Sequence, residues 1–211
     1  MPTNLYTMHV SLISIAFQYD LAIDVFHELG KTIKRVHDET ARFAETFSQY
    51  DSDSMWEDAN STIEDLHGAA FVISQTSITT IVSRVKALHE FAECDGHSIS
   101  SIPNQKGEML ASNSPLIPSK PVTYIQAIDA FANYFKHHDE WPRGWVNVDA
   151  RGKPTIETLE SLGVHYGTSA ILKNAMQFFD SSLLDLANTI NFWHEGILGK
   201  LKNELKDSEL I

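Results

Sequence analysis

The sequence has one cysteine, few prolines for its length and no long apolar run. A single cysteine, Cys94, excludes a disulfide within the chain and is typical of a reducing compartment. No stretch approaches the roughly 20 apolar residues that a membrane span needs, and the first apolar segment lacks basic residues before it and is interrupted by polar ones. We therefore expect a cytoplasmic chain with no membrane span and no secretory signal.

Basic residues are also scarce, since 16 Lys and Arg stand against 28 Asp and Glu and give a net charge of −12. This balance disfavours generic binding to a phosphate backbone or to anionic lipid, both of which rely on clustered basic side chains. The charge is uneven: residues 1–70 carry 12 acidic and 4 basic side chains, whereas residues 71–153 carry 8 of each. An anionic ligand is therefore expected in the middle third of the chain.

Apolar residues recur every three or four positions over most of the chain, which predicts α-helices. The expected helices cover about residues 5–29, 33–47, 61–93, 122–138, 155–162, 169–179 and 182–206. Gly30 is expected to stop the first helix, and a capping box of Ser61 and Glu64 to begin the third. Residues 96–121 hold four prolines and little periodicity, which indicates one long Pro/Ser-rich loop. The sequence thus predicts one all-α domain over 1–211, an antiparallel bundle of five to seven helices.

The helix predicted over 122–138 carries the most informative polar pattern. Asn133 and His137 lie four positions apart on the face opposite its apolar residues, so their side chains are neighbours. A carboxamide and an imidazole together can position a hydroxyl group and move a proton near neutral pH. The alternative is a solvated helix face that carries two ordinary polar residues.

The segment Asn133-Tyr-Phe-Lys-His137, late in a helical bundle, resembles the end of the R-N-x-x-x-H motif of the HEPN superfamily. This resemblance implies an all-α, metal-independent RNA endonuclease without a cofactor, often a homodimer whose cleft is formed by both copies of the motif. It also implies that His137 works on the scissile phosphate and the 2′-hydroxyl, supported by Asn133. Ala132 stands where the motif has arginine, so the planar cation that stabilises negative charge on phosphate is missing there.

Other cations could replace that arginine. Four basic residues lie close to the motif in the sequence: Lys136, Arg143, Arg151 and Lys153. Of these, Lys136 and Arg143 join the candidate catalytic residues, Arg143 within a turn bracketed by Trp141 and Trp145. The two tryptophans, with His138, are candidate binding residues because an indole can stack on a base or on a partner's side chain. The alternative is that both tryptophans only cap the end of the bundle.

A second candidate pair lies in the helix predicted over 61–93. Arg84 and His89 form a complete R-x-x-x-x-H string, but Val85 takes the place of the polar neighbour. At 100° per residue the two side chains lie about 140° apart and flank an apolar stripe. That geometry favours a structural role for the pair.

Strings typical of metal sites are isolated. Glu64-x-x-His67 has one good copy, whereas a di-iron bundle needs two such helices. The E-x-x-E pairs that begin at Glu90 and Glu157 are far apart in the chain. We therefore expect no metal site, although a metal-dependent nucleotide hydrolase is kept as a third function.

The residues leave three functions open. The first is a HEPN-like RNA endonuclease of a toxin, defence or stress system, or a catalytically degenerate relative of one. The second is a non-enzymatic helical module that binds a protein or nucleic-acid partner through the surface over residues 133–145. The third is the metal-dependent hydrolase.

Overall fold

A computed structural model describes residues 3–94 and 96–207. Within them it has seven α-helices, one isolated β-bridge between Leu116 and Thr123, and no strand, which confirms the all-α prediction. The helices are α1 (Thr3–Ala44), α2 (Gln49–Cys94), α3 (Lys106–Ala111), α4 (Tyr124–His137), α5 (Lys153–Leu162), α6 (Ile171–Ala175) and α7 (Leu183–Asp207). Three short 3₁₀ helices are η1 (His138–Glu140), η2 (Arg143–Trp145) and η3 (Met176–Phe179).

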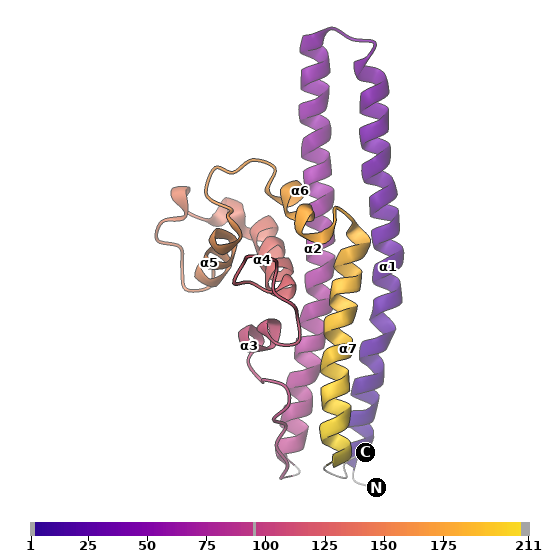
Figure 1. Cartoon of the computed structure of the whole chain (residues 1–211), viewed down its shortest axis with the longest axis vertical. Coiled ribbons are helices and arrows are strands. Elements are labelled where there is room, and N and C mark those ends of the chain that lie inside the picture. The colour runs from indigo at the N-terminus through magenta and orange to yellow at the C-terminus, as the bar shows by residue number, and fades with distance from the viewer. Residues whose placement is uncertain (1–2, 95, 208–211) are drawn as a thin grey trace.

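Helices α1 and α2 form one long antiparallel hairpin that rises beyond the rest of the molecule (Figure 1). Two predictions were wrong here, because α1 runs through Gly30 and α2 begins at Gln49 rather than at Ser61. A glycine weakens a helix by only about 1 kcal/mol relative to alanine, which packing along a long hairpin exceeds. The residues between the helices expected over 33–47 and 61–93 also have side chains that face α1, since the rings of Trp56 and His37 lie 5.2 Å apart.

Helix α7 packs along α1 and α2, and α3 to α6 form a lobe beside α2 (Figure 1). The core lies where these layers meet and includes the fully buried Trp193 of α7. The Trp193 indole N–H donates hydrogen bonds to the carbonyls of Ser112 and Met109, at 2.9 and 3.3 Å. These bonds tie the end of α3 to α7.

The segment over residues 96–121 was predicted to be one long loop, but it contains the short helix α3. Its first part is fixed to α7, because Glu204 accepts hydrogen bonds from the backbone N–H groups of Ser100 and Ser101, at 2.6 and 3.0 Å. Helix α4 then begins with a capping box between Thr123 and Gln126. The Thr123 hydroxyl also donates to the Leu110 carbonyl at 2.9 Å, which ties the start of α4 to α3.

Candidate functional site

Helix α4 is the element that positions the predicted site. Its apolar face packs into the core, where Ile125, Ile128 and Phe131 are fully buried. Ala132 is also fully buried, so the position at which the HEPN motif has arginine points into the core. A guanidinium group that starts from this position would have to be taken out of water. The structure thus gives a packing reason for the alanine.

The opposite face of α4 is not the solvated helix face that was the alternative to a functional pair. It packs against α2 and α5, and Gln75 of α2, only 6% exposed, reaches it. The Gln75 amide donates to Oδ1 of Asp129 at 2.7 Å and to Oδ1 of Asn133 at 2.8 Å. Its carbonyl accepts from Nζ of Lys136 at 2.6 Å, and Lys106 of α3 donates to Asp129 at 2.8 Å. One polar network therefore joins α2, α3 and α4.

Asn133 is engaged in this network. Its Oδ1 accepts from Gln75, and its Nδ2 is 3.4 Å from both Oδ2 of Asp129 and Oγ1 of Thr155 in α5. Asn133 and His137 line the same cavity but do not hydrogen-bond to each other within the described part of the chain. Asn133 therefore acts first as a structural link between α2, α4 and α5.

Lys136, the other α4 candidate, is held by Gln75, so its ammonium group supports the network as well. Gln75 was not among the predicted site residues. The sequence does contain a sign of its role. Gln75 is polar but lies at helical spacing from the core residues Ile78 and Val82, at a position where an apolar side chain is usual. A buried amide at such a position needs partners, and here they come from α4.

His137 ends α4 and has a different environment. Its side chain is 45% exposed, and Nδ1 lies 3.3 Å from Oε2 of Glu140 in η1. If the carboxylate accepts the Nδ1 proton, the lone pair of Nε2 is available to a ligand. Glu140 was not among the predicted site residues. The pairing follows from the 3₁₀ turn after α4, which returns the chain to the helix end.

A cavity of about 550 Å³ opens beside this pair. The residues that give it its chemistry are Asn133, His137, Glu140, Trp141, Asp149 and Arg151. Arg151 also lines a neighbouring cavity of about 360 Å³, whose wall includes Lys106 and Asp129. The Asp149 carboxylate accepts from the backbone N–H groups of Arg151 and Gly152, at 3.1 and 2.8 Å, and so fixes the turn that presents Arg151. The structure thus brings Arg151, rather than the predicted Arg143, to the wall that His137 lines.

The other aromatic candidates form a cluster. His138 stacks on Tyr134 with ring centroids 4.8 Å apart, and its Nδ1 is 3.1 Å from the Tyr134 carbonyl. Trp145 lies edge-on to Trp141 at 6.1 Å and to Tyr166 at 6.3 Å. His138 and Trp145 therefore cover the end of the bundle, whereas Trp141 belongs both to the cluster and to the cavity wall. Arg143 is exposed and lies outside that wall.

The second candidate pair is not brought together on one surface. Arg84 is exposed, whereas His89 is 5% exposed and its Nε2 has no hydrogen-bond partner among the described residues. Glu64 of the E-x-x-H string accepts from the backbone N–H groups of Leu172 and Lys173, at 2.7 and 2.8 Å, and thereby caps α6. In the described ranges no three His, Cys, Asp or Glu side chains are grouped to hold a metal ion.

None of the helices in residues 3–94 and 96–207 combines the length and apolar character needed to cross a membrane. In comparisons with known proteins, no family model, no curated protein and no solved structure matches this chain.

Proposed function

We propose that this chain is a HEPN-like helical module, catalytically degenerate at the motif arginine, that binds single-stranded RNA at the cavity beside the end of α4. The observation that carries the proposal is that one cavity wall combines the cation Arg151, the indole of Trp141 and the imidazole of His137. Proteins recognise single-stranded RNA with three kinds of group. These are a cation that contacts the phosphate, an aromatic ring on which a base stacks, and a donor or acceptor for the 2′-hydroxyl.

The size and charge of the site define how it binds. A volume of about 550 Å³ is in the range of small-ligand sites and suits one or two nucleotides rather than a folded partner. The net charge of −12 provides no long-range attraction for a polyanion. Affinity must therefore come from local contacts, and we expect it to be modest and to weaken with salt.

A metal-independent RNA endonuclease is the second candidate, and the pairing of His137 with Glu140 favours it. A carboxylate on Nδ1 orients the ring and leaves Nε2 to accept a proton from a 2′-hydroxyl. Arg151 would then take the role of the absent motif arginine from outside the motif. We rank binding first because Ala132 is buried in the core and Asn133 is engaged with Gln75. A cytoplasmic location and a homodimer accompany both candidates and stay predictions.

The test is binding of a fluorescently labelled single-stranded RNA of about ten nucleotides, measured by anisotropy in EDTA at low salt, with the same samples then run on a gel. We expect wild-type protein to bind the RNA, and Arg151→Ala and Trp141→Ala to weaken binding at least fivefold. Lys153→Ala is the matched control, because it removes a positive charge two positions away whose side chain lies near Glu157, outside the cavity wall.

The outcomes separate the candidates. Binding without cleavage supports the module. Cleavage that persists in EDTA and is lost in both His137→Ala and Arg151→Ala supports the endonuclease. Absence of RNA binding, or equal binding by the Arg151→Ala and Lys153→Ala proteins, overturns the proposal.

A further inference from the structure

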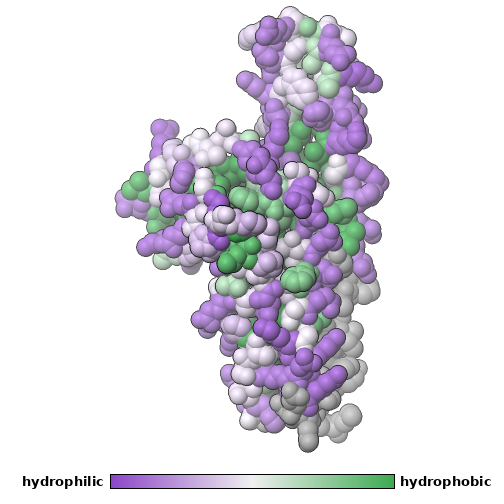
Figure 2. All heavy atoms as spheres, in the orientation of Figure 1, coloured by the Kyte–Doolittle hydropathy of each residue, from purple (hydrophilic) through white to green (hydrophobic). Residues whose placement is uncertain are grey.

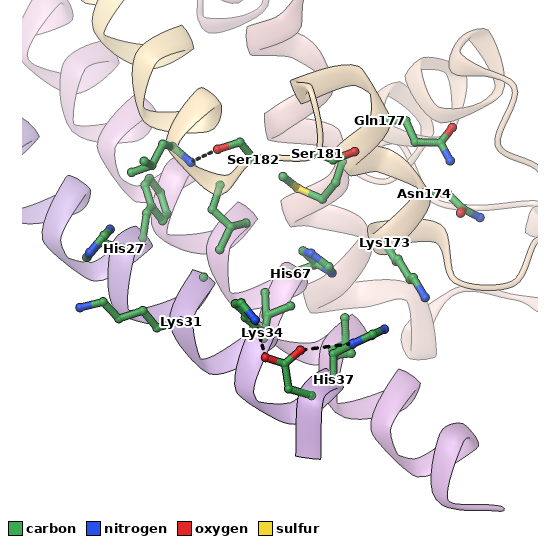
Figure 3. A pocket seen from close by; sticks show the side chains of 18 residues that line it. His27, Lys31, Lys34, His37, His67, Lys173, Asn174, Gln177, Ser181 and Ser182 are labelled. Carbon is green, nitrogen blue, oxygen red and sulfur yellow. Dashed lines mark hydrogen bonds and ion pairs between the residues drawn. The ribbon is translucent and has the colours of Figure 1, made fainter. Parts of the chain in front are cut away.

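A larger cavity, of about 740 Å³, lies apart from the α4 site, between α1, α2 and the segment from α6 to the start of α7 (Figure 3). We name it the hairpin groove. Its apolar lining includes Phe26, Ile63, Met176 and Leu183, each less than 10% exposed. Side chains of α1 and of α6 face each other across it, with His67 of α2 between them. The groove is thus concave and mostly apolar, as small-molecule sites usually are.

Positive side chains border the groove. Lys31 pairs with Glu28 at 2.7 Å, and Lys34 pairs with Asp38. Lys173 differs, because its Nζ donates to the neutral carboxamide oxygen of Asn60 at 3.0 Å and forms no ion pair within the described residues. Of the three lysines that line the groove, Lys173 is thus the one that is in no ion pair with a described residue, in a chain that is acidic as a whole. The carboxylate of Glu64, which caps α6, is occupied with the backbone N–H groups of Leu172 and Lys173.

His67 adds a polar group to the inner wall. Its Nδ1 is buried and has no hydrogen bond of normal geometry to a described residue. Burial and the nearby charge of Lys173 lower the pKa of His67, against a smaller opposite effect of the Ile63 carbonyl. The lowered pKa favours the neutral ring, so the formal positive charge on this side of the groove is that of Lys173.

We propose that the hairpin groove binds a monomeric medium-chain fatty carboxylate, with its alkyl chain on the apolar wall and its carboxylate at Lys173. A single unpaired ammonium group balances a single negative charge, and no arginine lines the groove to hold a phosphate bidentately. The volume is in the usual range for a ligand of this size, about 300–1,000 Å³. This site is independent of the RNA-binding proposal, because none of its lining residues lines the α4 cavity.

Isothermal titration calorimetry of the whole chain with decanoate, below its micelle concentration, tests the proposal. We expect one decanoate per chain, a negative heat-capacity change from apolar burial, and at least tenfold weaker binding of decanol. Lys173→Met, which removes the charge and keeps an unbranched chain, should lower decanoate affinity about tenfold and leave decanol unchanged. Lys200→Met is the control, because Lys200 is exposed on α7, sixteen residues beyond the lining residue Leu184.

Several results would overturn the proposal. Equal affinities for decanoate and decanol would show that no charge is recognised. Equal losses in the Lys173→Met and Lys200→Met proteins would place the anion elsewhere. Absence of saturable decanoate binding, or a dimer seen by sedimentation whose formation excludes decanoate, would mean that the groove is not a fatty-acid site. If the Arg151→Ala protein still binds decanoate, the hairpin groove and the α4 cavity are separate sites. Loss of decanoate binding in that protein would contradict the placement of decanoate in the hairpin groove.

Discussion

Three individual side chains of α4 that are close in sequence lie in different environments. Ala132 is fully buried, Asn133 is bonded to Gln75, and the side chain of His137 is 45% exposed beside Glu140. A step of 100° per residue turns Ala132 into the core and Asn133 towards α2 and α5. His137 lies in the last turn of α4 and is half exposed, so the residue available for chemistry is at the end of α4.

A close approach between α2 and α4 gives a stability prediction. A Cβ atom on Gly68 would lie 2.2 Å from Cδ2 of Phe135 and 2.6 Å from its Cγ, so the ring or the helix must shift. We expect Gly68→Ala to lower the free energy of unfolding by about 1–3 kcal/mol, as overpacked core positions do. Urea unfolding followed by circular dichroism measures it.

Gly30→Ala is the matched control, because a Cβ on this α1 glycine meets nothing within 4 Å. Alanine is the better helix former, so we expect this substitution to stabilise the protein by about 0.5–1 kcal/mol. The account of the α2–α4 contact fails if both substitutions change stability by the same amount and sign.

At the scale of elements, periodicity predicted those helices whose buried face is regular. The starts of α4, α5 and α7 fall within about two residues of the predictions, because a single apolar face packs on the core in each. The continuity of α1 and the early start of α2 were missed, since pairing between two long helices outweighs the local signals at Gly30 and Ser61. Local sequence carries no record of that pairing.

As with the helices, the part of the site that depends on local spacing could be predicted, and the part that depends on tertiary packing could not. Helical spacing placed Asn133 and His137 on one helix, and both line the same cavity. It could not supply Arg151 or Gln75, which come from the turn before α5 and from α2 and reach α4 only through tertiary packing. Arg143 lies nearer than Arg151 to His137 in sequence, yet only Arg151 lines the cavity with it.

The contact between the segment after α2 and helix α7 gives a pH dependence. Burial acts to raise the pKa of Glu204, but hydrogen bonds from Ser101 and Ser100 outweigh it and lower that pKa from 4.5 to about 2. A carboxylate with a lowered pKa stabilises the fold above its ordinary pKa, and the stabilisation is lost as the pH falls from about 5 to about 2. Glu204→Gln should remove it.

We therefore expect Glu204→Gln to unfold more easily than wild type at pH 7, by on the order of 1–2 kcal/mol after allowance for solvent screening. The difference should shrink towards pH 2, where wild type has also lost its carboxylate. Denaturant unfolding across this pH range measures both effects, with the exposed Glu160→Gln as control. A difference that does not change with pH would contradict the role of the charge.

For the whole molecule, packing is uneven along the hairpin. No residue between 27 and 58 is buried, whereas α2 from Ile63 onwards and the lobe share the core. Polar residues cover most of the face in Figure 2, including most of the part of the hairpin that rises beyond the lobe. The far end of the hairpin is thus held by the pairing of α1 with α2 and little else.

This unevenness predicts the pattern of local opening. We expect amide hydrogen exchange over residues 40–56 to be much faster than over residues 68–92, because few buried contacts oppose opening at the far end. Exchange read by mass spectrometry at two protein concentrations checks it. Equal protection of both segments, lost on dilution, would instead show that a second copy covers the hairpin end.

We propose that RNA contacts the chain at the end of α4 and at the turn before α5. Cross-linking of wild-type protein to a single-stranded RNA that contains 4-thiouridine, with the linked peptide identified by mass spectrometry, tests this most directly. We expect cross-links within residues 137–151, at Trp141 above all, and their loss in Arg151→Ala. Cross-links confined to the hairpin end, to the hairpin groove or to no defined segment would contradict it.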